Sequence, residues 1–160
     1  MADIKRKLGT AGQTLTLTLA SLANNAARQS TEVTNSTDLY LDALVMLKIK
    51  TGASGTSAAS HVAIYAYSTV DDGTTRSENA GASDAGITLT DPPNVRFLGT
   101  INCPANSTTY TGGPFSIARA FDGVLPARWG IVVMNRSGST LSATEGDHAK
   151  LWQGVHLQTV

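Results

Sequence analysis

The feature that most constrains the fold is a strict alternation of side-chain type along much of the chain. In residues 13–19 (QTLTLTL) every second residue is Leu, and the residues between are Thr. Successive side chains of a β-strand point to opposite faces, so this segment would have one apolar face and one hydroxylated face. Thr is β-branched, which favours a strand over a helix. The segment is therefore predicted to be a half-buried strand.

The same period of two recurs in later segments. Residues 38–50 carry apolar side chains at every odd position, from Leu39 to Ile49. A helix over these residues would place charges on its apolar stripe, so a strand is predicted. Further strands are predicted at residues 61–69, 87–90, 94–101, 115–121, 127–135, 140–144 and 149–160. We expect eight or nine strands and no helix.

Polar segments rich in small residues separate these predicted strands. Residues 51–60 (TGASGTSAAS) and residues 71–86 (DDGTTRSENAGASDAG) are predicted to be exposed loops. Pro92 and Pro93 cannot donate to a strand ladder, so pairing is expected to stop there. Turns are predicted at residues 122–126 and 136–139.

This pattern predicts an all-β fold. Eight or nine strands in 160 residues suit an antiparallel two-sheet sandwich that is jelly-roll-like. An immunoglobulin-like sandwich is the alternative, and an up-and-down barrel is third because the loops differ in length. We expect an N-terminal arm over residues 1–12 and a single β-sandwich domain over residues 13–160.

The composition of the chain excludes some classes of partner. Lys plus Arg is 12 and Asp plus Glu is 12, so the formal net charge is zero, and only 15% of the residues are charged. The chain instead holds 21 Thr, 14 Ser, 15 Gly and 21 Ala. A neutral chain exerts no long-range attraction on nucleic acid or anionic lipid, and no window holds the roughly 18 apolar residues that span a bilayer. We therefore expect neither nucleic acid nor a membrane as a partner.

Residues with metal-binding chemistry are few and lack the familiar spacings. His61, His148 and His156 are far apart in the sequence, although His148 and His156 could approach each other across a final hairpin. Hard oxygen ligands gather only in the loop that carries Asp71, Asp72, Glu78 and Asp84. That loop lacks the alternating acidic pattern of a calcium loop. No metal and no cofactor are expected.

Signs of catalysis are equally sparse. Cys103 is the single cysteine, which excludes an intrachain disulfide, and no histidine lies near it in the sequence. The chain has no Gly-x-Ser-x-Gly elbow and no glycine-rich phosphate loop. The residues after Lys5, Arg6 and Lys7 do not form the apolar region of a signal peptide. We therefore expect a protein that is not an enzyme and is synthesised in a reducing cytoplasm, with no catalytic residues to assign.

Aromatic residues leave a second function open, because β-sandwiches often bind sugars through exposed rings. The candidate rings are those of Tyr40, Tyr65, Tyr67, Tyr110, Trp129 and Trp152. Trp129 and Trp152 lie in apolar segments, where burial in the core is the commoner outcome.

Four segments resemble small β-sandwich virion proteins of tailed bacteriophages. These are residues 15–24 (LTLTLASLAN), 27–31 (ARQST), 35–43 (NSTDLYLDA) and 123–133 (GVLPARWGIVV). The resemblance runs over most of the chain. It rests on the residue pattern of the predicted β-sandwich strands and not on a catalytic motif. Size and composition are most similar to a capsid decoration, or cement, protein.

The resemblance implies a structural role in the virion, at the capsid surface, after synthesis in the host cytoplasm. Such proteins bind the lattice of the major capsid protein and stabilise it, often as trimers. We therefore expect the major capsid protein as a partner, and we expect the chain to form a homo-oligomer, with a trimer as the first choice. The resemblance implies no cofactor and no active-site residues. The basic arm at residues 1–7 would face an acidic capsid surface or extend a neighbouring sheet. A receptor- or carbohydrate-binding module of a phage head or tail fibre is the alternative.

Overall fold

The long alternating segments of the sequence form the central strands of two antiparallel sheets. The computed structural model describes residues 3–159. One sheet, here the β11 sheet, has the order β1 (Ile4–Leu8), β11 (Ala149–Thr159), β5 (Asp42–Lys50) and β9 (Thr109–Ser116), with β2 (Gln13–Thr14) also paired to β11. The other, the β10 sheet, has the order β7 (Ala85–Ile87), β3 (Ala27–Gln29), β10 (Arg128–Arg136), β6 (His61–Thr69) and β8 (Arg96–Asn102), with β4 (Val33–Thr34) also paired to β10.

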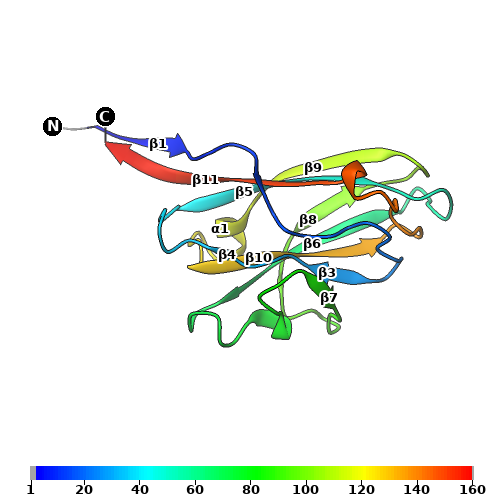
Figure 1. The fold of residues 1–160 in the computed structure, drawn as a ribbon, viewed down its shortest axis with the longest axis horizontal. Helices are drawn as coiled ribbons and strands as arrows, with labels where there is room; N and C mark the ends of the chain where they lie inside the picture. Colours follow the sequence, from blue (N-terminus) through cyan, green and yellow to red (C-terminus); the bar gives the residue numbers. More distant parts are fainter. Residues whose placement is uncertain (1–2, 160) are drawn as a thin grey trace.

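The two sheets face each other in a sandwich (Figure 1), as the alternation predicted. The all-β, antiparallel two-sheet architecture is confirmed, while the finer choice between a jelly roll and an immunoglobulin-like sandwich stays a prediction. Across the interface, Trp129 of the β10 sheet and Trp152 of the β11 sheet meet edge to face, with ring centroids 5.5 Å apart and planes at 86°. Both tryptophans are core residues, in agreement with the burial expected for them.

The chain between β6 and β8, residues 70–95, covers the outer face of the β10 sheet (Figure 1). It runs to β7 at the far edge of the sheet and then returns to β8 at the opposite edge. A second apolar cluster lies beneath it, in which Ala80 and Val95 pack on Tyr67 and Val132. The predicted exposed loop is thus a third layer, which explains why β6 and β10 are buried on both faces.

Residues 15–19 were predicted to continue a strand, and this is wrong. Pairing stops after β2, and the chain crosses from the β11 sheet to the β10 sheet with Leu15, Leu17 and Leu19 buried between them. Its backbone is bonded to both sides: Leu15 N donates to Lys150 O (2.8 Å), and Thr16 O accepts from Thr31 N (2.8 Å). A segment that spans two sheets cannot share a ladder with either of them, although it keeps the alternation of a strand.

Carboxylates replace the missing strand partners of this crossing segment. Asp84 accepts from Thr18 N (3.1 Å) and from Thr18 Oγ1 (2.6 Å). Glu145 accepts from Leu19 N (2.9 Å) and Ala20 N (2.7 Å) and also pairs with Lys150. The N–H groups of residues 18–20 thereby find acceptors, which the segment needs because unpaired buried amides are costly.

Other predicted elements also change. The predicted strand at 115–121 is the end of β9 followed by a short helix, α1 (Ile117–Ala120), whose N-cap is Ser116. The predicted strand at 140–144 is an isolated bridge between Leu141 and Thr51, followed by a 3₁₀ turn, η2 (Glu145–Asp147). A second 3₁₀ turn, η1 (Ser77–Asn79), lies in the third layer. The expectation of no helix was wrong at α1 because a serine cap and a buried Ile117 stabilise a single helical turn.

The crossing segment makes the stability of the sandwich depend on Glu145. We predict that Glu145→Gln lowers the free energy of unfolding by about 2 kcal/mol, because an amide cannot replace the charged acceptor of two backbone N–H groups and Lys150. Urea denaturation followed by tryptophan fluorescence measures the change. Asp38→Asn, at an exposed position, is the control and should change stability by less than about 0.5 kcal/mol.

The same variant should change the dependence of stability on pH. Burial tends to raise the pKa of Glu145, but the hydrogen bonds from Lys150, Ala20 and Leu19 outweigh it and hold the pKa below the ordinary 4.5. A carboxylate with a lowered pKa contributes stability above its ordinary pKa, and that contribution is lost as the pH falls through the lowered value. Glu145→Gln should therefore lose less stability than the wild type between pH 5 and acid, and equal slopes would contradict the assigned role.

Candidate functional site

The histidines do not form a site. His148 is buried, its Nδ1 accepts from Lys50 N (3.3 Å), and its Nε2 lies 3.2 Å from Ser142 O, which fixes a neutral tautomer. Burial lowers the pKa of His148. His156 lies eight residues along the same extended segment, roughly 26 Å away at the rise of a strand, and not across a hairpin. His61 begins β6, and its Nδ1 lies 3.1 Å from the carbonyl oxygen of Ala59.

The acidic loop residues are dispersed over separate structural contacts. Asp71 accepts from Thr69 Oγ1 (2.5 Å) and Thr75 N (2.8 Å), and these bonds lower the pKa of Asp71. Glu78 accepts from the backbone N–H groups of Thr90 and Asn94. Across residues 3–159, no group of three or more His, Cys, Asp or Glu side chains is arranged to hold a metal ion.

The remaining acids of that loop fasten the third layer to the sandwich. Asp72 accepts from Arg128 Nε (2.7 Å), and Asp84 accepts from Arg28 Nε (2.6 Å). Glu32, whose side chain is only 5% exposed, binds both Arg128 Nη1 (2.9 Å) and Arg76 Nε (2.6 Å). Burial tends to raise the pKa of Glu32, but the hydrogen bonds from the two arginines outweigh it, so the pKa is lowered. These ion pairs are structural.

Most of the candidate sugar-binding rings are turned inward. Trp129 and Tyr67 are fully buried, and Tyr67 donates its hydroxyl to Ser30 O (2.8 Å). Tyr110 accepts from Ala105 N (2.9 Å) through its hydroxyl. Tyr65, by contrast, packs against an exposed ring, that of Phe97 of β8, at a ring-centroid distance of 5.6 Å, and Phe97 is 59% exposed. Sequence reasoning missed Phe97, because alternation alone did not show which face of β8 is open.

The most distinctive surface feature is a two-stranded ribbon, formed by β1 and residues 155–159 of β11. It projects beyond the rest of the sandwich (Figure 1), with Ile4 opposite Thr159 and Leu8 opposite Val155. Every residue of β1 is exposed, including Ile4 at 65% and Leu8 at 54%. Residues 4–8 of the predicted arm are therefore a paired strand; Met1, Ala2 and the predicted strand end at Val160 lie outside the described residues.

Aromatic packing holds the base of this ribbon. The ring of Tyr40 lies against Trp152 (5.9 Å, edge to face) and against His156 (5.6 Å). Gly154 makes this possible, because a Cβ there would lie 2.4 Å from Cδ1 of Tyr40. Asn35 fixes the backbone of Tyr40 by accepting from its N–H (2.8 Å) and donating to its carbonyl (2.9 Å).

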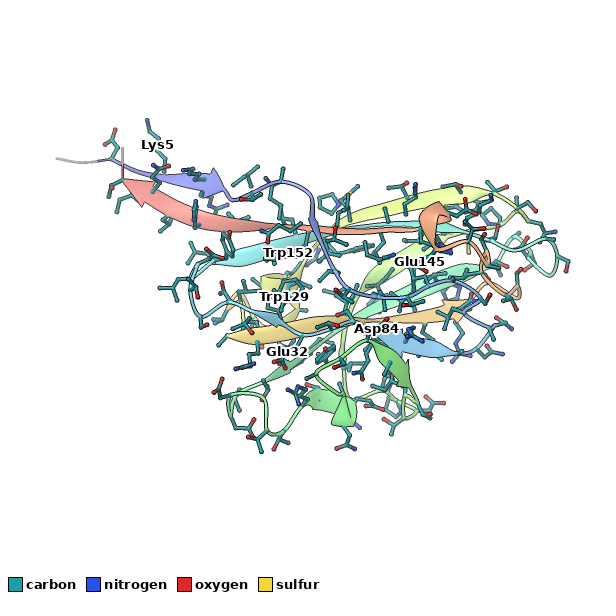
Figure 2. The ribbon with its side chains drawn as sticks, in the orientation of Figure 1. Lys5, Glu32, Asp84, Trp129, Glu145 and Trp152 are labelled. Carbon is teal, nitrogen blue, oxygen red and sulfur yellow. The ribbon has the colours of Figure 1, made fainter. Side chains whose placement is uncertain are left out.

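The ribbon carries uncompensated positive charge. Lys5, Arg6 and Lys7 are consecutive, and none of them forms an ion pair with a carboxylate of residues 3–159. Figure 2 shows Lys5 at the ribbon, remote from Glu32, Asp84 and Glu145 in the body of the sandwich. A free strand edge with like charges resists pairing with a second copy of itself and attracts an acidic partner.

A groove of about 930 Å³, here the terminal groove, lies between the ribbon and the segment that follows α1. Its apolar lining comes from Leu8, Leu41, Leu44, Val124, Leu125 and Val155. Arg6, Lys7 and Arg119 add cations, and Asp42 and Asp122 add carboxylates. The basic arm is visible in the sequence but the groove is not, because the pattern predicts Leu41 in a strand and Val124 in a turn without showing that both are exposed.

Cys103 is not a reactive thiol. Its side chain is fully buried in the core, and burial raises the pKa of Cys103 to about 11. We predict that a disulfide reagent at pH 8 modifies the native protein at least about 100-fold more slowly than the urea-unfolded chain. The exposed variant Ser54→Cys is the matched control and should react at the rate of a free thiol. Rapid labelling of native Cys103 would contradict its burial.

Within residues 3–159, no helix is long and apolar enough to cross a membrane. Comparisons with protein-family models, with curated proteins and with solved structures yield no match for this chain. What the ribbon and the terminal groove can bind is therefore argued below from their own shape and charge.

Proposed function

We propose that this protein is a structural virion protein of a tailed phage, a decoration or cement protein that binds the major capsid protein and stabilises the capsid. It acts at the capsid surface as a homo-oligomer, after synthesis in the host cytoplasm, and it catalyses no reaction and needs no cofactor. The observation that carries the proposal is the projecting ribbon, whose three consecutive cations have no partner among residues 3–159.

The positions of the charged and reactive side chains support a binding role. The buried or half-buried acids Glu32, Asp84 and Glu145 are bonded to arginine, lysine or backbone N–H groups, so they serve the fold. Cys103 and His148 are buried. The three cations of the ribbon, by contrast, form no ion pair within the described chain. An isolated two-stranded ribbon is also only marginally stable in water. Both properties fit an element that is completed by a partner.

The composition supports a protein that is arranged in many copies. Only 15% of the residues are charged, and a formal net charge of zero removes long-range repulsion between neighbouring copies. The cations of β1 disfavour edge-to-edge pairing of two ribbons. Each ribbon would thus remain available for an acidic surface of the capsid protein.

The test is binding to capsids that lack this protein. We predict that the wild-type protein binds such capsids and that deletion of residues 1–12 abolishes binding, measured by co-sedimentation. The finer variant Lys5→Glu/Lys7→Glu keeps the strand and should weaken binding at least about tenfold, because it reverses the charge offered to the partner. Lys48→Glu, a lysine of β5 with no ion pair among residues 3–159, is the control outside the ribbon, and Lys5→Glu alone is the ribbon variant with the same change of charge.

Two results would end the proposal. In the first, the wild-type protein does not bind the capsids. In the second, the wild-type protein is monomeric and the charge-reversed variant binds the capsids as well as the wild type does. Circular dichroism of each variant shows that the sandwich is retained, so a loss of binding is attributable to the ribbon.

A receptor- or carbohydrate-binding module is the second candidate, and the pair of Tyr65 and Phe97 favours it. An exposed ring on a sheet surface can stack on the apolar face of a sugar. A glycan array tests this: a specific ligand whose binding falls at least about tenfold in Phe97→Ala would favour this function. Binding that is unchanged in Phe97→Ala, or no ligand at all, would leave the capsid role preferred.

A further inference from the structure

The terminal groove is an open apolar surface at the base of the ribbon. Leu8, Leu41 and Val124 are 54%, 49% and 69% exposed, and all three line it. On the outer face of the β10 sheet, in contrast, Ala27, Tyr67 and Val132 are covered by residues 70–95. Exposed apolar groups that converge on one concave surface mark a binding site more often than scattered ones do.

A vacant strand position lies beside the groove. β5 begins at Asp42, opposite Val155, and Leu41 N donates to Val155 O (2.6 Å). Beyond this point, residues 156–159 of β11 pair only with β1 among the described residues. The backbone of β11 on the β5 side is therefore open to an extended segment that would continue the line of β5.

The charged residues at the groove indicate which side chains an extended segment bound there would carry. Arg6, Lys7 and Arg119 line the groove without an ion-pair partner among residues 3–159. Of the two carboxylates, Asp42 already accepts from Ser116 Oγ (2.7 Å) and Ala118 N (2.9 Å). The three cations outnumber the two carboxylates, and a second copy of the ribbon, with its own Lys5 to Lys7 cluster, would be repelled.

We infer that the terminal groove binds an extended segment of a partner protein in which apolar side chains alternate with carboxylates. The apolar side chains enter between the ribbon and the segment after α1, the carboxylates meet Arg6, Lys7 and Arg119, and the backbone adds to the free side of β11. The identity of the partner as the major capsid protein rests on the proposed function, whereas the chemistry of the segment rests on the groove.

The experiment uses the full chain and a fluorescein-labelled nine-residue peptide in which Val alternates with Glu. Fluorescence anisotropy should show saturable binding of this peptide, and the same peptide with Lys in place of Glu should not bind. Val124→Asp and Arg119→Glu, both at exposed positions, should each weaken binding at least about tenfold. Val70→Asp is the matched control, because Val70 is fully exposed and is not part of the groove.

Equal binding of the acidic and basic peptides, no binding of the acidic peptide, or full binding by Val124→Asp would each overturn the inference. Sedimentation of Val124→Asp gives a further arm: conversion of a wild-type oligomer to a monomer would show that a second copy fills the groove, and this too would overturn it. Capsid co-sedimentation of the same variant separates the two proposals. If Val124→Asp binds capsids like the wild type, the capsid protein is not the partner of the groove, while the capsid role stands.

Discussion

The structure depends on closing the gap between its two sheets with a segment that belongs to neither ladder. Leu15, Leu17 and Leu19 fill the core from this side, so the segment cannot leave, yet its N–H groups face no neighbouring strand over much of its length. Glu145 and Asp84 supply the acceptors, and they reach the segment from η2 and from the residue that precedes β7. Burial of the leucines and hydrogen bonding of the backbone N–H groups therefore hold the same segment in place. Through Glu145, this also connects the C-terminal part of the chain to the N-terminal part.

The third layer follows from the same logic on another face. Without residues 70–95, Tyr67 and Val132 would expose apolar surface on the outer side of the β10 sheet. The layer contributes few large apolar groups of its own, so ion pairs supplement it: Arg76 and Arg128 converge on Glu32, and Arg128 also holds Asp72. Acids that the sequence places in one loop are separated in this way, because each is drawn to a different cation or backbone donor. A loop that looked like a weak calcium site is a structural cover.

The sequence predicts the sheet elements well where alternation coincides with a complete ladder. β5, β6 and β10 lie within two residues of their predicted bounds, except at the start of β5, where Leu39 and Leu41 precede the strand. It fails at residues 15–19 because alternation reports which side chains are buried and not which backbone lies alongside. It misses β3 and β4 because two or three residues cannot show a period. For the site, the basic run at residues 5–7 was visible in the sequence, but its pairing with β11 and the groove beside it depend on residues about 35 to 150 positions away.

A formal net charge of zero conceals how the charges are arranged. Five acids of the described chain are neutralised by ion pairs inside the sandwich or at its third layer, and five cations are used there in the same way. Among the cations that remain, three are consecutive on β1, on a ribbon that stands clear of the body. Screening limits the range of such a cluster to about 8 Å at physiological ionic strength, so it does not attract polyanions from afar. It acts on a surface that is already close, which is the situation of a protein seated on a lattice, and the apolar groove next to it supplies the short-range attraction that the charges lack. A formal net charge of zero for the whole chain and a basic cluster at one edge are thus compatible. Together they favour a partner that is bound through short-range contacts over one that is attracted by long-range electrostatics.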